Sequence, residues 1–265
     1  MQRFSILAAS VVVGFLGAAT TMGCAGSSDT TDDGTTADAI IGGHTDSNDA
    51  AVVELVEAVG SSGDEYTCTA TFISTSVLLT AAHCVVEENH PKIIPSNASF
   101  RIMMGTSRSA AKKSDWIAVR RANVHPHPGY DGDAAHDVAI IVLDSPVAVT
   151  PVAIRRTPIT SAMAGSNVRL VGFGQATRKS GPNDGSETKR TVQTTLRSLD
   201  GNLVKIGKTG QQACDGDSGG PAFLSVNGVD TLIATDDLAA TDVDCAGGDL
   251  YQRVDLHLDF IDTYL

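Results

Sequence analysis

The sequence predicts an all-β protein, a barrel or a sandwich, that begins near Ile40. From that point onward, short apolar runs alternate with Gly, Asn and Asp turn residues, which is typical of many short strands. Hydrophobic residues make up 42% and charged residues 19% of the chain, as in globular proteins with a substantial core. The runs that we expect to form strands are 51–59, 69–79, 99–104, 138–143, 168–173, 222–225 and 232–235.

The end of the chain predicts one amphipathic helix. Four apolar residues recur there at intervals of four, three and four, and so share one helical face: Val254, Leu258, Ile261 and Leu265. Asp255 stands where such a helix would begin.

Residues 1–23 are predicted to be a signal peptide. Arg3 precedes an apolar run, 6–16, that is too short to span a bilayer as a permanent helix. We therefore expect a secreted or cell-surface protein, on the extracellular or periplasmic side. Cys24 follows the leader and allows two interpretations. Either its thiol is lipidated, which would give a membrane anchor before activation, or ordinary cleavage discards it.

Residues 24–39 are predicted to be a propeptide or flexible tether. The stretch 25–39 holds no large apolar residue, so it cannot contribute to a core. Residues 40–265 then form the folded domain. The whole chain has a formal net charge of −12, which argues against nucleic acid as a partner because phosphates would be repelled.

The most informative motif is a glycine-rich turn at residues 216–221, with the sequence GDSGGP. Glycines allow a tight turn that exposes Ser218 and leaves backbone N–H groups free to stabilise an oxyanion. A serine between glycines also occurs in the nucleophile elbow of α/β-hydrolases, where an acid and then a histidine follow it. In this chain the order is His83, Asp137, Ser218, which argues against the elbow.

Five motifs in this order resemble the trypsin/chymotrypsin family of serine proteases, as a bacterial-type secreted member. They lie within residues 40–265 and are Ile40-Ile41-Gly42-Gly43, TAAHC at 80–84, DVAI at 137–140, GFG at 172–174, and the GDSGGP run. The resemblance implies two antiparallel β-barrels, about 40–155 and 156–265, with a C-terminal helix and an active site in the cleft between them.

The resemblance also implies the chemistry. Ser218 would attack a peptide carbonyl, His83 would take its proton, and Asp137 would orient His83. The N–H groups of Gly216 and Ser218 would form the oxyanion hole. We expect a serine endopeptidase that forms an acyl-enzyme on protein or peptide substrates. The alternative is a catalytically silent, surface-tethered binding protein on a protease scaffold.

The same family pairs a freed N-terminal amine with an aspartate beside the nucleophile. The matching residues are Ile40 and Asp217, so we expect a zymogen that is cut between Ala39 and Ile40. Because the cut follows Ala, the activating protease should favour small residues.

The chain has five cysteines, and Cys24 lies in the leader region. The resemblance pairs the other four as Cys68–Cys84 and Cys214–Cys245, which implies an oxidising compartment. We expect no cofactor, no metal and a monomer. The closely spaced His125 and His127 are expected to lie in a surface loop, and the basic segment 106–113 lacks the carboxylates that calcium requires.

The specificity of the substrate pocket stays open between two predictions. Gln212 replaces the acid of trypsin-like pocket floors, whereas Asp249 replaces a wall glycine and could reach a basic side chain. Asp237 stands where a glycine usually leaves the pocket open, and could restrict it to small residues. Two further departures from the family pattern are Thr235, where a serine is usual, and Thr69, where a glycine is common.

Overall fold

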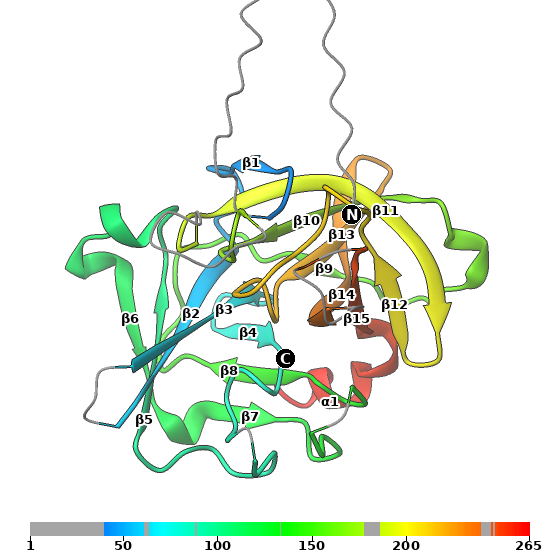
Figure 1. The fold of residues 1–265 in the computed structure, drawn as a ribbon. Coiled ribbons are helices and arrows are strands. Elements are labelled where there is room, and N and C mark those ends of the chain that lie inside the picture. Colours follow the sequence, from blue (N-terminus) through cyan, green and yellow to red (C-terminus); the bar gives the residue numbers. More distant parts are fainter. Residues whose placement is uncertain are drawn as a thin grey trace, which may run out of the picture. The chain divides into compact units, whose positions relative to one another are not determined.

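The computed structural model describes residues 40–265 except 61–63, 88, 133, 178–185, 240–244 and 246. The predicted signal peptide, Cys24 and the predicted propeptide lie outside the described residues. The all-β prediction is confirmed: two antiparallel sheets account for nearly all the regular structure (Figure 1). Among the residues that the structure describes, no helix has the length and apolarity needed to cross a bilayer.

The first sheet is a curled seven-stranded sheet with the order β6-β5-β2-β3-β4-β8-β7. Its strands are β2 (Val52–Val59), β3 (Asp64–Phe72), β4 (Val77–Thr80), β5 (Ala98–Met103), β6 (Trp116–Val119), β7 (Val124–Pro126) and β8 (Ala139–Val142). The long β2–β3 pair runs from Val52 opposite Thr71 to Val59 opposite Asp64.

The second sheet closes on itself. β11 pairs with both β10 and β12, so six strands in the order β11-β10-β13-β14-β15-β12 form a barrel. β1 extends it beside β11, and β9 pairs in parallel with β14. The strands are β1 (His44–Thr45), β9 (Ala153–Ile154), β10 (Asn167–Gly172), β11 (Arg190–Asp200), β12 (Leu203–Ile206), β13 (Pro221–Val226), β14 (Val229–Ala239) and β15 (Asp249–Arg253).

Apolar side chains fill each sheet and also the space between the two sheets. The interior of the first sheet contains Leu55, and that of the barrel contains Ile206. A third cluster joins the sheets, with Leu79 from the first and Phe223 from the second. Burying each such side chain is worth about 1.5–3 kcal/mol, so the third cluster fixes the two sheets against each other.

Two predicted elements differ in detail from the structure. The apolar run 69–79 is divided between β3 and β4 by a turn, in which the N–H of Ile73 donates to the carbonyl of Val77. The Ser74 hydroxyl accepts hydrogen bonds from the backbone N–H groups that follow it, which stabilises this turn. Periodicity cannot detect such a turn, because the residues on both sides are apolar.

The C-terminal helix is present but shorter than predicted. A 3₁₀ turn, η5 (Val254–Leu256), precedes α1 (Leu258–Asp262). Asp255 does not cap the helix, since its carboxylate accepts a hydrogen bond from the N–H of Ile159 and pairs with Arg253. The remaining 3₁₀ turns are η1 (Arg108–Ala110), η2 (Lys113–Asp115), η3 (Arg121–Asn123) and η4 (Ser161–Met163).

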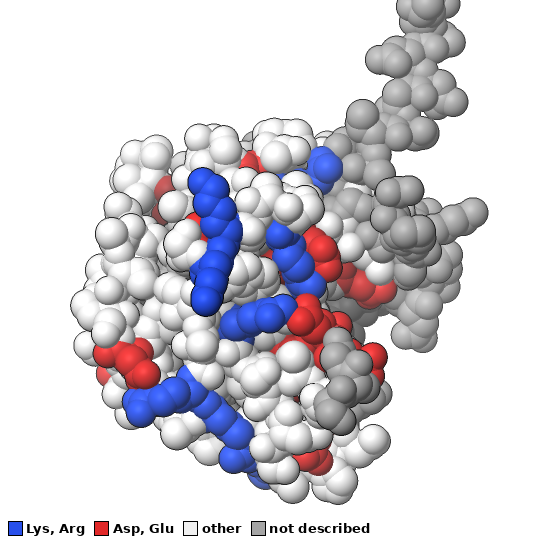
Figure 2. Space-filling view, turned by 90° about the vertical axis from the view of Figure 1, so that its left-hand side faces the viewer, with Lys and Arg blue, Asp and Glu red and all other residues white. Residues whose placement is uncertain are grey.

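Charged side chains on the β6 side of the molecule are mixed in sign. Figure 2 shows Lys and Arg scattered over this face, several of them directly beside Asp or Glu. Among the described residues, the guanidinium of Arg108 contacts Glu54 at 2.6 Å and also pairs with Glu65 and Glu187. On the described part of this face there is no continuous basic surface for a polyphosphate.

Candidate active site

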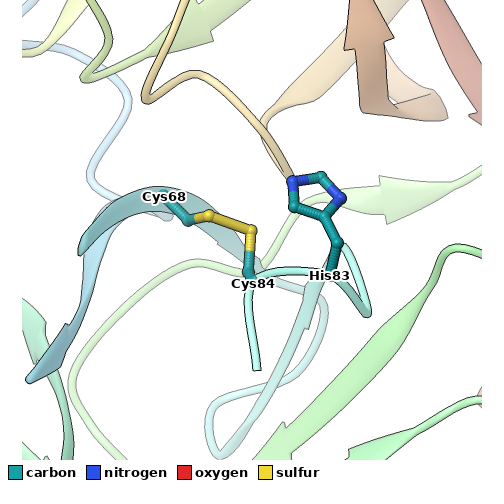
Figure 3. Close-up of side chains that lie close together, drawn as sticks. All are labelled: Cys68, His83 and Cys84. Atoms are coloured by element: carbon teal, nitrogen blue, oxygen red, sulfur yellow. A yellow bond between two sulfur atoms is a disulfide. The ribbon is translucent and has the colours of Figure 1, made fainter. Parts of the chain in front are cut away.

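His83 is held in place by the turn that follows β4 and by a neighbouring disulfide. The N–H of Val85 donates to the carbonyl of Ala82, which closes the turn. The next residue, Cys84, forms a disulfide with Cys68 on β3, and the imidazole of His83 lies beside this bridge (Figure 3). The predicted second disulfide, Cys214–Cys245, is also formed, so both pairings are confirmed.

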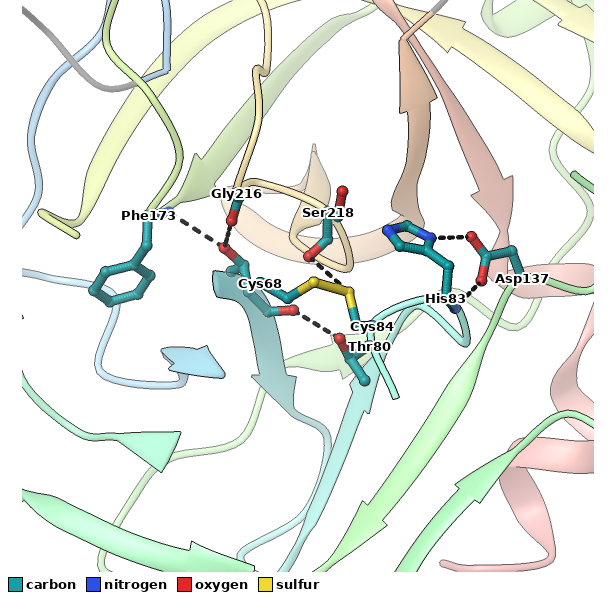
Figure 4. Close-up of a disulfide and its surroundings, with 9 residues drawn as sticks. Cys68, Thr80, His83, Cys84, Asp137, Phe173, Gly216 and Ser218 are labelled. Atoms are coloured by element: carbon teal, nitrogen blue, oxygen red, sulfur yellow. Dashed lines mark hydrogen bonds and ion pairs between the residues drawn. A yellow bond between two sulfur atoms is a disulfide. The ribbon is translucent and has the colours of Figure 1, made fainter. Parts of the chain in front are cut away.

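Asp137 holds His83 through two hydrogen bonds. Its Oδ2 lies 2.5 Å from Nδ1 of His83, and its Oδ1 accepts the backbone N–H of His83 at 2.8 Å (Figure 4). The aspartate is buried, whereas the histidine side chain is 34% exposed. Burial alone would raise the pKa of Asp137, but the hydrogen bond and charge of His83 outweigh it and lower that pKa. Asp137 is therefore a buried carboxylate that fixes the orientation of His83.

Ser218 lies in a turn that the first sheet anchors. The backbone N–H of Thr69 on β3 donates to the carbonyl of Ser218 at 2.8 Å. The next residue, Gly219, has a φ of +78°, and a Cβ there would lie 2.2 Å from the hydroxyl of Thr80. Glycine is thus required where this turn contacts the first sheet. Ser218 and His83 line the same pocket, which has a volume of about 640 Å³.

Thr69 makes a connection that the sequence analysis did not foresee. Its hydroxyl donates to the carbonyl of Gly216 at 3.2 Å and accepts the N–H of Phe173 (Figure 4). Gly216 has a φ of +95°, a conformation that L-residues rarely adopt. The threonine was visible only as a departure from a family pattern. Its position gives it a function, because it fixes the turn that carries Gly216 and Ser218.

Asp237 lies against Asp137. Asp237 shares a side-chain hydrogen bond with Asp137, and its Oδ2 accepts the side-chain N–H of Gln252 at 2.9 Å. Burial, and then the charge of Asp137, raise the pKa of Asp237 to about 9. At neutral pH Asp237 is therefore a protonated acid that donates to Asp137. Restriction of the substrate pocket by Asp237 was one of the two specificity predictions left open; in the structure its carboxyl contacts Asp137 and Gln252. Thr235 is fully buried.

Asp217 is a buried carboxylate without a neighbouring cation among the described residues. Its oxygens accept the N–H groups of Gly174 at 2.8 Å and Cys214 at 2.9 Å. Burial raises its pKa to about 7, since these two hydrogen bonds only partly offset the loss of water. Ile40 is 1% exposed and belongs to the same apolar cluster as Ala213. The side chain of Ile40 is thus already inside the barrel.

Two more acids lie in the barrel wall near Asp217. Burial raises the pKa of Asp249 to about 8, with a further contribution from the charge of Asp217. Burial, and then the charge of Asp249, also raise the pKa of Asp236, whose carboxyl is hydrogen-bonded to Tyr251. The Oδ2 of Asp249 accepts the N–H of Ala213 at 3.1 Å. Asp249 therefore faces the interior and not solvent.

Gln212 is the other predicted pocket residue. It is 1% exposed, and neither atom of its side-chain amide has a hydrogen-bond partner among the described residues. Its backbone forms a bridge with Ile41, next to the predicted cleavage site. A buried amide without partners costs roughly 1–3 kcal/mol. Gln212 therefore has unused hydrogen-bonding capacity in this part of the barrel.

The chain is similar to known proteins over most of its length. The trypsin family model matches residues 40–261. Brachyurin of Leptuca pugilator is 28% identical over 76% of this chain and 88% of its own length. Serine protease SP24D of Anopheles gambiae is 30% identical over 76% of this chain and 73% of its own length. Trypsin of Sus scrofa is 24% identical over 71% of this chain and 80% of its own length.

The family match covers most of the chain and includes every residue of the site, from His83 to Ser218. The matched relatives are similar over most of their own lengths as well. The fold, with a closed barrel beside a curled sheet, is the one that the family resemblance implied. This chain belongs to the trypsin family of serine proteases.

Proposed function

We propose that the chain is an exported serine endopeptidase that hydrolyses peptide bonds through Ser218, His83 and Asp137. The observation that carries the proposal is the doubly hydrogen-bonded His83–Asp137 pair, which lines one pocket together with Ser218. A hydroxyl is a weak nucleophile at neutral pH and needs an adjacent base. His83 is that base, because Asp137 binds Nδ1 and leaves Nε2 free to take the serine proton.

The proposed reaction has two halves, acylation and deacylation of Ser218. Ser218 Oγ attacks the carbonyl carbon while His83 Nε2 accepts its proton, and Asp137 stabilises the imidazolium. The N–H groups of Gly216 and Ser218 stabilise the oxyanion. His83 returns the proton to the leaving amine, which leaves an acyl-enzyme. Water repeats the sequence and releases the acid.

Replacing the nucleophile should abolish peptide hydrolysis without unfolding the protein. Because the three residues act as a unit, Ser218→Ala should lower kcat/KM by at least about a thousandfold. His83→Ala should lose a similar amount. Peptidase assays on the activated protein, with circular dichroism as the folding control, check this. Wild-type activity in the Ser218→Ala protein would contradict the mechanism.

We propose further that the chain is a zymogen and that cleavage of the Ala39–Ile40 bond activates it. Asp217 holds Gly174 and Cys214, which flank the loop carrying Gly216 and Ser218. A freed ammonium at Ile40 would pair with this carboxylate and offset its burial. The ion pair would order the oxyanion hole. An activating protease that accepts Ala is a partner in this proposal.

The uncut protein should lose stability as pH rises. A carboxyl whose pKa is higher in the folded than in the unfolded state binds more protons when folded. For Asp217, the contribution of this extra proton to the stability of the folded state is complete below the ordinary pKa of 3.8. It is lost as the pH rises through about 7. The loss of stability is on the order of 4 kcal/mol for this group, at about 1.4 kcal/mol per pKa unit.

Urea unfolding between pH 4 and pH 8 measures this loss. Both forms should carry Ser218→Ala, and the form beginning at Ile40 should show a smaller loss because its ammonium pairs with Asp217. Identical pH profiles for the cut and uncut proteins would contradict the ion pair between Ile40 and Asp217.

Asp237 supports the catalytic aspartate in this proposal. Asp237→Asn keeps a donor toward Asp137 and should retain kcat/KM within about tenfold. Asp237→Ala leaves the buried Asp137 carboxylate short of a donor, which costs roughly 1–3 kcal/mol, or about 10–100-fold in kcat/KM. Parallel kinetics on the two variants test this. Equal activity of the Ala and Asn variants would show that the hydrogen bond has no catalytic role.

The acids of the barrel favour a basic residue before the scissile bond. Asp249 faces the interior, and Asp237, on which the preference for small residues rested, contacts Asp137 instead. Asp249 is protonated near neutral pH when alone, and an arriving guanidinium would stabilise its ionised form. Such a shielded pair is worth about 1.5–3 kcal/mol.

Asp249→Asn should therefore lower kcat/KM for Arg peptides by roughly 10–100-fold relative to matched Ala peptides. The comparison uses peptides that differ only at the residue before the scissile bond. The Asn variant keeps the size of the side chain and removes its charge. A wild type that cuts Ala peptides faster than Arg peptides would reject the basic preference.

Export is the last part of the proposal. The two disulfides form in an oxidising environment, which agrees with the predicted leader. We propose an extracellular or periplasmic monomer that acts on proteins or peptides. If Cys24 is lipidated, cleavage at Ile40 releases the protease domain from the membrane, so activation and release are one event.

A further inference from the structure

A second cluster of titratable side chains lies behind the catalytic aspartate. His127 follows β7, His136 directly precedes Asp137, and His257 lies between η5 and α1. One ring nitrogen from each residue lies within 4.8 Å of the others. The rings of His127 and His136 are parallel, with centroids 4.6 Å apart, and the His257 ring lies edge-on to both at 5.3 and 5.4 Å.

The hydrogen bonds of His257 leave one nitrogen free to bind a metal. The side-chain N–H₂ of Gln252 donates to Asp237 and to the carbonyl of Ala134, so its Oε1 is an acceptor. That Oε1 lies 3.2 Å from Nε2 of His257, which must therefore carry the proton. The Nδ1 of His257 then presents a lone pair. It is buried and has no hydrogen-bond partner among the described residues.

His136 contributes a second ring nitrogen that is free to bind a metal. Its Nδ1 is also buried and unpartnered within the described part of the chain. A φ of +62° gives His136 a left-handed backbone conformation, which is uncommon outside glycine. His127 differs, because its Nδ1 accepts the N–H of Gly129 at 3.0 Å. This hydrogen bond is exposed, so His127 can exchange it for a metal at small cost.

We propose that His127, His136 and His257 form a binding site for a divalent transition-metal ion, with Zn²⁺ as the best fit. Three neutral imidazoles suit Zn²⁺ and its neighbours, whereas calcium and magnesium require oxygen ligands. Zn–N bonds of about 2.0–2.1 Å place two nitrogens of a tetrahedral site about 3.4 Å apart. The three rings must therefore approach one another by about 1.5 Å at most.

The environment supports this assignment, although we expected no metal from the sequence. His257 is 3% exposed, and a proton on its buried Nδ1 would have no acceptor among the described residues, which favours the neutral ring that binds a metal. Gln252 acts as the outer partner that fixes the orientation of a ligating histidine. Phe260 on α1 covers one side of His127, with ring centroids 4.7 Å apart.

A metal here would connect the C-terminal helix to the segment that carries Asp137. His136 is covalently adjacent to Asp137, and His257 reaches it through Gln252 and Asp237. Bound Zn²⁺ would thus join α1, β7 and the segment before β8. Metal binding should raise Tm, because the ion binds the folded protein alone.

Isothermal titration with ZnCl₂ tests the proposal on the full exported chain carrying Ser218→Ala and Cys24→Ser. These changes prevent self-cleavage and remove a thiol that could bind zinc. We expect one Zn²⁺ per chain and a rise in Tm that a chelator reverses. His136→Asn should weaken binding by at least about 100-fold, since loss of an outer partner alone costs 10–100-fold. Asn is chosen because it tolerates a positive φ.

Two matched controls separate this site from others. His125→Asn changes a histidine that stacks on Tyr264, outside the cluster, and should leave the Zn²⁺ Kd unchanged. His83→Ala should also leave it unchanged, which excludes the catalytic histidine as the ligand. Gln252→Met should weaken binding about 10–100-fold by releasing His257.

Three results would overturn the proposal. They are no zinc binding by the parent chain, the same Kd in His136→Asn as in the parent, or an equal loss in His125→Asn. Co²⁺ in place of Zn²⁺ supplies an independent signal, because a site with nitrogen ligands gives visible absorption that His136→Asn should abolish.

Discussion

The buried carboxylate of Asp217 is the constraint on which the active site depends. It accepts hydrogen bonds from Gly174 and Cys214, and so ties the end of β10 to the turn that carries Ser218. A Cβ at Gly172 would lie 2.1 Å from its Oδ1, and one at Gly174 would lie 2.6 Å from its Cγ. The GFG motif therefore consists of glycines that let a carboxylate approach the backbone. An unpaired buried carboxylate is costly, and a freed amine at Ile40 would offset that cost.

Buried carboxyl groups recur in and beside the barrel wall, and a raised pKa lets each of them be protonated and so reduces the cost of its burial. Asp217, Asp236, Asp237 and Asp249 all have raised pKa values, first because they are buried. Asp237 uses its proton to support Asp137. In our proposal Asp217 would pair with the freed amine of Ile40, and Asp249 would pair with a basic side chain of the substrate. In our account the buried acidic residues have two roles. They hold the catalytic aspartate in place, and they form the ion pairs that would drive activation and substrate binding.

Much of the fold and of the candidate site could be predicted from the sequence, because motifs with a fixed spacing adopt a recurrent local structure. The predicted runs correspond to β2, β3, β4, β5, β8, β10, β13 and β14, and both disulfides and the family were also predicted. β11 (Arg190–Asp200) was not predicted, because threonines occur on both of its faces. The alternation of apolar and polar residues that marks a strand is therefore weak. The contact between Asp237 and Asp137 was not predicted, because the two residues lie far apart in the chain and no local pattern links them. His257 lies far from His127 and His136 in the chain, and only the fold brings the three histidines together.

The central claim is that Ser218 becomes a reactive nucleophile once Ile40 is free. Intact-mass analysis after treatment with a phosphonylating reagent tests it most directly, on the chain beginning at residue 25 and on the chain beginning at Ile40. The account predicts one adduct per molecule on the Ile40 form, mapped to Ser218, and much slower labelling of the longer chain. Absence of an adduct on the Ile40 form would contradict the assignment of Ser218, and equal labelling rates would contradict activation through Asp217.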